Sequence, residues 1–132
     1  MQKIIITGQG LTLEKIIKVC REYAFVELAE EAKKKVLESR KVVDDFVNGE
    51  KVVYGVTTGF GKFSDVTITK EESKLLQKNL IITHAVGAGK PFETEIVRGI
   101  MLLRVNNLAK GFSGAKLETI QTLIDMLNKR VH

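Results

Sequence analysis

The hydrophobic pattern of the first 50 residues predicts one strand and two helices. The β-branched run Ile4–Ile6 stops before two glycines, which is typical of an edge strand followed by a turn. Thr12 is suited to N-cap a short helix. The inner side of that helix would carry Leu13, Ile16, Ile17 and Cys20. A longer helix is predicted from about Glu27 to Asn48, with a C-terminal stop at Gly49. Its apolar stripe would consist of Leu28, Ala32, Val36, Val43 and Val47.

The second half of the sequence predicts three further helices. Thr69 and Glu72 match a capping box, in which a hydroxyl and a carboxylate satisfy reciprocal backbone donors. The helix that it opens carries Leu76, Leu80 and His84 at i,i+4 spacing. Pro91 suits the first turn of the next helix, and Ser113 suits the cap of the last. The inward positions of these two helices would be Ile96, Ile100, Leu103 and Leu108, then Leu117, Ile120, Ile124 and Leu127. The chain is therefore predicted to be a single, mainly α domain over residues 1–132 with a short N-terminal β element.

Composition and charge exclude several classes of function. With 44% hydrophobic and 28% charged residues, the chain is expected to be globular. The net charge of +5 does not predict a nucleic-acid partner, because Lys34 and Lys35 lie four residues after Glu30 and Glu31 and are spaced to pair with them on a solvated helix face. Apolar runs are too short to span a membrane. The single cysteine, Cys20, has flanks typical of a buried hydrophobe and indicates a reducing compartment, so we expect a cytoplasmic protein.

A glycine-rich stretch around Tyr54 is the first candidate for chemistry. Its members are Tyr54, Gly55, Thr58, Gly59, Phe60 and Gly61. Glycines at this spacing favour a loop with positive φ angles or close approach of the backbone to a ligand. A tyrosine hydroxyl on such a loop could act as a base if its pKa fell from the ordinary value of about 10. The alternative is a tyrosine packed at a strand end before an ordinary turn.

His84 is the second candidate, and it also has two interpretations. A histidine near the end of a helix often bonds to the last carbonyls at the negative end of the helix dipole. Gly87 and Gly89 just beyond it equally suit a site where a ligand approaches the backbone. A metal site is not expected, because His84 and His132 are far apart and neither has a carboxylate at metal-ligand spacing.

Several motifs in register resemble the N-terminal part of the aromatic amino acid ammonia-lyases. The matching segments include Tyr54–Gly61, Leu76–Ile81, Thr83–Gly87, Met101–Asn106 and Gly111–Gly114. The resemblance covers essentially the whole chain. Within the family, the triplet Thr83-His84-Ala85 is similar to the histidine ammonia-lyase branch.

This resemblance implies a fold and an activity. The fold would be the N-terminal part of a fumarase/aspartase-like helical enzyme, which assembles as a homotetramer. The reaction would be elimination of ammonia from L-histidine to give trans-urocanate. Tyr54 matches the family's catalytic tyrosine, and His84 matches the residue that recognises the substrate ring. The electrophile would be 4-methylidene-imidazol-5-one, formed by cyclisation of an Ala-Ser-Gly tripeptide.

The chain contains no Ala-Ser-Gly tripeptide. Phe112-Ser113-Gly114 is only a superficial look-alike at a helix boundary. We therefore expect an N-terminal fragment of a lyase that is inactive alone and carries no cofactor of its own. Two alternatives stay open: a lyase or aminomutase for another aromatic amino acid, and a non-catalytic module that binds a small molecule or serves in assembly.

Overall fold

A computed structural model describes residues 2–49, 53, 56, 58 and 70–132. The described elements are two strands and five helices, in the order β1 (Lys3–Ile6), α1 (Leu13–Cys20), β2 (Phe25–Leu28), α2 (Glu30–Asn48), α3 (Lys70–His84), α4 (Thr94–Leu108) and α5 (Leu117–Lys129). They divide between two compact units. We call Met1–Lys41 with Pro91–His132 the core unit and Val42–Lys90 the intervening unit. The predicted mainly helical class with a short N-terminal β element is confirmed; the single-domain assignment stays a prediction.

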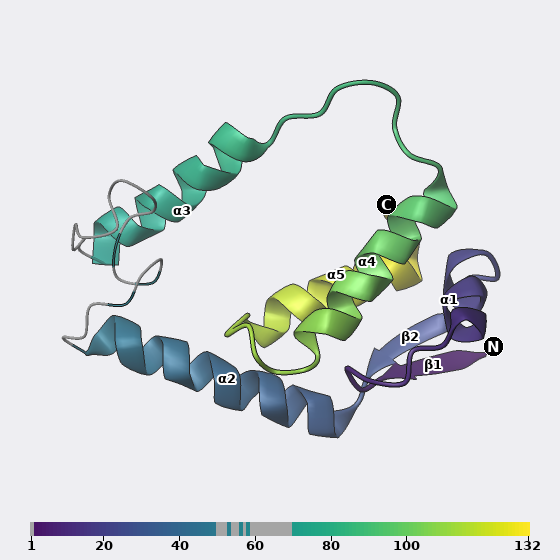
Figure 1. The fold of residues 1–132 in the computed structure, drawn as a ribbon, viewed down its shortest axis with the longest axis horizontal. Helices are drawn as coiled ribbons and strands as arrows, with labels where there is room; N and C mark the ends of the chain where they lie inside the picture. The colour runs from purple at the N-terminus through teal and green to yellow at the C-terminus, as the bar shows by residue number, and fades with distance from the viewer. Residues whose placement is uncertain (1, 50–52, 54–55, 57, 59–69) are drawn as a thin grey trace. The chain divides into compact units, whose positions relative to one another are not determined.

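The two strands form a parallel sheet, with α1 as the crossover between them (Figure 1). Ile4 pairs with Val26 and Ile6 with Leu28, and all four side chains are buried on one face. The strand at Ile4–Ile6 was predicted, but β2 was not, because Phe25–Leu28 was assigned partly to the start of the long helix. Leu28 is thus a strand residue of the sheet core, and α2 begins two residues later at Glu30.

The free edge of β2 is closed by a side chain from α5. The Asn128 carboxamide accepts a hydrogen bond from the Val26 N–H at 2.8 Å and donates one to the Val26 carbonyl at 2.9 Å. An amide side chain carries the same donor and acceptor pair as a peptide group, so it replaces a third strand at this position. An open edge would otherwise be a template for pairing with another chain.

Helix α1 begins as its sequence predicts, and its predicted inner face is confirmed at Ile16 and Cys20 but not at Leu13. The Thr12 hydroxyl accepts from the Lys15 N–H, which confirms the predicted N-cap. Val19 and Cys20 are buried, whereas Leu13 is 68% exposed, so its predicted inward position is wrong. Burial raises the pKa of the Cys20 thiol, since a thiolate would lose its hydration there. The prediction of Cys20 as a buried small hydrophobe is confirmed.

The inward face of α4 also differs from the predicted one. Met101, Leu102 and Val105 are buried, while Ile96, Ile100 and Leu103 are about half exposed. The helix is apolar on two sides, so periodicity alone does not select the side that faces the core. Leu108 packs against the core as predicted. Pro91 lies outside the helix, which starts only at Thr94 after an extended Glu93.

The last helix has the predicted stripe but a different start. Ile120, Ile124 and Leu127 are buried, and Leu117 packs against them. The residue at the N-cap position is Lys116, in an extended conformation, so Ser113 does not cap α5. Gly111 before it has φ +77°, and an added Cβ would lie 2.7 Å from the Lys35 Cβ. Glycine therefore allows the α4–α5 connection to approach α2 closely.

Arg98 on α4 is a buried cation that joins two helix ends. Its Nε and Nη2 donate to the Val19 carbonyl in the last turn of α1, at 3.2 and 2.8 Å, and its Nη1 donates to the Leu127 carbonyl of α5 at 2.9 Å. The last carbonyls of a helix lack intrahelical donors and form the negative end of its dipole. Desolvation lowers the pKa of the guanidinium, which nonetheless stays protonated. Arg98 thus fixes the packing of α1, α4 and α5.

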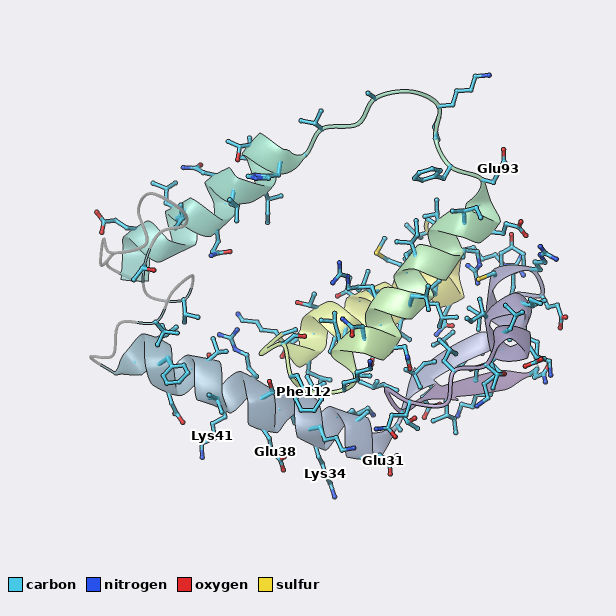
Figure 2. The ribbon with its side chains drawn as sticks, viewed as in Figure 1. Glu31, Lys34, Glu38, Lys41, Glu93 and Phe112 are labelled. Atoms are coloured by element: carbon cyan, nitrogen blue, oxygen red, sulfur yellow. The ribbon has the colours of Figure 1, made fainter. Side chains whose placement is uncertain are left out.

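The lysines that raise the net charge lie on the solvated side of α2. Figure 2 shows Glu31, Lys34, Glu38 and Lys41 along this side, and all four are exposed. The ion pair on this helix joins Glu30 to Lys33 rather than to the predicted Lys34, since i,i+3 residues are also surface neighbours. Alternating charges on one face support the prediction of a solvated helix. Among the described residues, no helix is long and apolar enough to cross a membrane.

Candidate functional site

The structure describes two of the predicted site residues. His84 is the last residue of α3, and Thr58 is buried with 1% exposure; both belong to the intervening unit. Tyr54, Gly55, Gly59, Phe60 and Gly61 lie outside the described residues. The assembly of a tyrosine loop with His84 therefore stays a prediction.

The His84 ring is held by two groups of its own helix turn. Its Nδ1 lies 2.9 Å from the Leu80 carbonyl oxygen and 3.1 Å from the Thr83 hydroxyl oxygen. The Thr83 hydroxyl also donates to the Leu80 carbonyl at 3.0 Å. The ring is otherwise exposed. The helix-end interpretation of His84 is therefore correct for Nδ1, and the outer side of the ring is available to a ligand.

Helix α3 stops at His84 and the chain continues without regular structure. The Ala85 N–H still donates to the Ile81 carbonyl at 2.9 Å, and the Val86 N–H turns back to the His84 carbonyl at 2.9 Å. Gly89 then has φ +87°, with open space where a Cβ would be. The His84 ring therefore lies at the end of α3, next to a segment whose residues are exposed.

The described apolar residues of α3 are exposed or half-buried. Leu75 is 58% exposed, Ile81 71% and Ile82 62%. Leu76 and Leu80 are half-buried, and none of the described α3 side chains is fully buried. Large apolar side chains grouped on an exposed helix are typical of a surface that another chain or segment covers.

Two hollows in the core unit were not predicted from the sequence. One, of about 360 Å³, is lined by Cys20, Arg21, Tyr23, Glu93, Thr94 and Glu95. The other, of about 350 Å³, is an apolar groove between α1 and α4 that includes the outward residues Leu13, Ile96, Ile100 and Leu103. Neither contains a predicted site residue. Among the residues that the structure describes, no group of three or more His, Cys, Asp or Glu side chains could hold a metal ion.

The look-alike tripeptide Phe112-Ser113-Gly114 has a structural role. The Gly114 N–H donates to the Ser39 hydroxyl at 2.9 Å, and the Gly114 carbonyl accepts from the Arg40 guanidinium at 3.2 Å. These bonds attach the α4–α5 connection to α2. The amide nitrogen that a cyclisation would use is therefore engaged, and Phe112 is 88% exposed (Figure 2).

Comparison with known proteins identifies the family. The sequence profile of the family described as aromatic amino acid lyase matches residues 11–132. The chain belongs to the aromatic amino acid lyase family. The histidine ammonia-lyase of Alkaliphilus oremlandii is 61% identical over 132 residues, which are 100% of this chain and 26% of that protein. The chain thus spans about a quarter of the length of the curated relatives it matches.

Solved structures of related enzymes have the same fold. The crystal structure of histidine ammonia-lyase from Trypanosoma cruzi matches with a TM-score of 0.89 and 35% identity, over 96% of this chain and 25% of that one. The ergothionase of Treponema denticola, an ergothioneine-degrading enzyme, matches with a TM-score of 0.90 and 29% identity, over 96% and 26%. The predicted ammonia-lyase fold is confirmed.

Proposed function

We propose that this chain is the N-terminal part of a histidine ammonia-lyase, which converts L-histidine to trans-urocanate and ammonia. The observation that carries the proposal is the 61% identity to a histidine ammonia-lyase along the entire chain. The presence of Thr83-His84-Ala85 at the end of α3 supports the choice of substrate, because an exposed imidazole can bond to the ring of a histidine.

Within this proposal, Tyr54 is the base and His84 recognises the substrate ring. The β-hydrogen of an amino acid is weakly acidic, so its removal needs a well-placed base in a site protected from water. The glycine-rich loop of Gly55, Thr58, Gly59, Phe60 and Gly61 would carry that base. His84 would orient the imidazole so that the β-carbon lies near the Tyr54 hydroxyl.

Two components of the proposed enzyme lie outside these 132 residues. The electrophile 4-methylidene-imidazol-5-one, which supplies an electron sink for the elimination, would come from an Ala-Ser-Gly in the rest of the protein. Further subunits of a homo-oligomer would cover apolar surface such as Leu75, Ile81 and Ile82. The single cysteine supports a cytoplasmic location. Neither a nucleic acid nor a membrane is proposed as a partner.

A related enzyme acting on another substrate is the second candidate. The ergothionase has nearly the same backbone over this region, so the fold is compatible with a different substrate. A lyase or aminomutase for another aromatic amino acid would use the same Tyr54. A non-catalytic module that binds a small molecule or serves in assembly is the third candidate. Sequence identity ranks the histidine ammonia-lyase candidate first, since this chain is 61% identical to a histidine ammonia-lyase and 29% identical to the ergothionase.

Product analysis tests the proposal. The gene product that extends beyond His132 is incubated with L-histidine, L-phenylalanine or L-tyrosine, and the 132-residue chain serves as the control. We expect urocanate and ammonia from L-histidine with the longer product, and no product from the 132-residue chain. Turnover of phenylalanine or tyrosine in preference to histidine would favour the second candidate. A natural stop codon after His132 would favour the third, and urocanate from the 132-residue chain would contradict our assignment of the electrophile.

A further inference from the structure

Three polar atoms meet at the C-terminal end of α3. They are His84 Nδ1, the Thr83 hydroxyl oxygen and the Leu80 carbonyl oxygen, and each pair lies at 2.9 to 3.1 Å. Because all three distances are hydrogen-bond distances, the positions of the protons among these atoms are restricted.

The carbonyl oxygen determines which ring nitrogen carries the proton. A carbonyl oxygen can only accept, so an unprotonated Nδ1 at 2.9 Å would place two lone pairs against each other. The Thr83 hydroxyl donates its single proton to the same carbonyl, so its oxygen can accept from the ring but does not donate to it. The arrangement is satisfied only when Nδ1 carries a hydrogen.

The other ring nitrogen is then an acceptor. A neutral imidazole has one N–H, so a proton on Nδ1 leaves a lone pair on Nε2. The His84 side chain is exposed, and no described residue is within hydrogen-bond distance of Nε2. The ring therefore offers an acceptor to whatever ligand reaches the end of α3.

We propose that the Leu80 carbonyl and the Thr83 hydroxyl hold neutral His84 as its Nδ1–H tautomer, so that Nε2 accepts a hydrogen bond from an N–H of a heteroaromatic substrate ring. Thr83 is a positioning residue in this scheme. An imidazole ring supplies such a donor and a phenyl ring does not. The assignment of the substrate ring rests on the proposed function, whereas the tautomer is a property of this chain.

Nitrogen NMR tests the tautomer on the 132-residue chain itself. The sequence has only two histidines, His84 and His132, so a His132→Gln variant assigns both. At alkaline pH, where imidazole is neutral, we expect a pyrrole-type Nδ1 and a pyridine-type Nε2 for His84. The exposed C-terminal His132 provides the reference for an unconstrained ring. A pyrrole-type Nε2 at His84, as in an unconstrained ring, would overturn the proposal.

Two substitutions at position 83 test the positioning residue. Thr83→Val keeps the shape and removes the hydroxyl, and it should lower the ratio of Nδ1–H to Nε2–H tautomer about two- to tenfold, as expected for one hydrogen bond. Thr83→Ser keeps the hydroxyl and should restore the ratio. If the ratio is unchanged in Thr83→Val, Thr83 has no positioning role.

The longer gene product links the tautomer to recognition. Thr83→Val should raise the KM for L-histidine about two- to tenfold with little change in kcat, and Thr83→Ser should restore it. A product that does not act on histidine, with an Nδ1–H tautomer at His84, would refute the proposed function and leave the tautomer intact. Histidine turnover with an Nε2–H tautomer would refute the tautomer alone.

Discussion

Helix α5 of the core unit and helix α3 of the intervening unit differ in how far they bury their apolar residues. In the core unit, α5 buries Ile120, Ile124 and Leu127 at no more than 1% exposure. In the intervening unit, α3 leaves Ile81 71% exposed and Ile82 62% exposed. Helix α5 therefore buries its apolar stripe within the core unit, whereas α3 carries apolar surface that the described residues leave exposed. The candidate site belongs to the second kind of region.

Polar groups show the same contrast. Buried Arg98 bonds to carbonyls of α1 and α5, and Asn128 closes the edge of β2, so both of these side chains are paired within the core unit. His84 uses Nδ1 locally and leaves Nε2 without a partner among the described residues. A scaffold needs its polar atoms paired, whereas a binding residue needs one atom left for the ligand. We interpret the core unit as the scaffold and α3 as part of the site.

Removing the Tyr54 hydroxyl should have the largest effect, and only on catalysis. Tyr54→Phe in the longer gene product is expected to lower kcat for L-histidine on the order of 10²- to 10⁴-fold, because general-base catalysis is lost. The control is Tyr23→Phe, which changes the only other tyrosine and should leave turnover within a few-fold. Turnover of Tyr54→Phe within a few-fold of wild type, with normal expression, would exclude Tyr54 as the base.

Matched truncations of apolar side chains test the contrast in stability. Leu102→Ala in α4 removes a fully buried side chain and should lower the free energy of unfolding by about 2–5 kcal/mol. Ile81→Ala in α3 removes a largely exposed one and should change it by about 0.5 kcal/mol or less. Urea denaturation of the 132-residue chain measures both. Equal losses would mean that α3 is packed as firmly as α4.

A pair of arginines on α4 tests the buried polar contacts. Arg98→Met removes the guanidinium donors to the Val19 and Leu127 carbonyls, of which Leu127 keeps only the Arg130 N–H at 3.4 Å, and should cost about 1–3 kcal/mol of stability. Arg104→Met changes an exposed arginine of the same helix and should cost about 0.5 kcal/mol or less. The same urea titration gives both values. A neutral Arg98→Met would show that these contacts do not stabilise the core unit.

Replacement of Cys20 should have the smallest effect on the free energy of unfolding, and its pH-dependent part should be seen only at alkaline pH. Burial raises the pKa of its thiol in the folded chain, so the unfolded chain loses its proton first as the pH rises. The thiol's contribution to stability is therefore complete below the ordinary thiol pKa of about 8.5 and is lost as the pH rises through the folded value. Urea titrations at increasing alkaline pH should show a steeper decline for the wild type than for Cys20→Ala. Parallel declines would contradict this.

Element types were more predictable from the sequence than the faces that the elements bury. Thr12 caps α1 and the stripe from Leu117 to Leu127 packs inward because local rules act there without competition. The prediction for the inner face of α4 is wrong because the side that carries Ile96 and Ile100 is no more apolar than the side that is buried. The burial of Arg98 could not be predicted, because the carbonyls that accept its hydrogen bonds come together only in the folded chain. Strand β2 was missed because Phe25–Leu28 is short and is stabilised by pairing with β1 and by Asn128.

For the site, the residues themselves suggested Tyr54 and His84, but only the family resemblance gave them roles. A glycine-rich loop and a histidine at a helix end each have an ordinary structural explanation. The sequence gives no signal for the Leu80 carbonyl, because every residue has one and only the helix turn selects it. Thr83 could be noticed only as a neighbour of His84.

Hydrogen exchange tests most directly whether the site region is completed from outside this chain. Amide exchange is measured by mass spectrometry in the 132-residue chain and in the longer gene product. We expect peptides from α5 to be protected in both, because this helix is buried in the core unit. Peptides from α3 (Lys70–His84) should exchange quickly in the 132-residue chain and become strongly protected in the longer product. Equal protection of α3 in the two proteins would contradict the account.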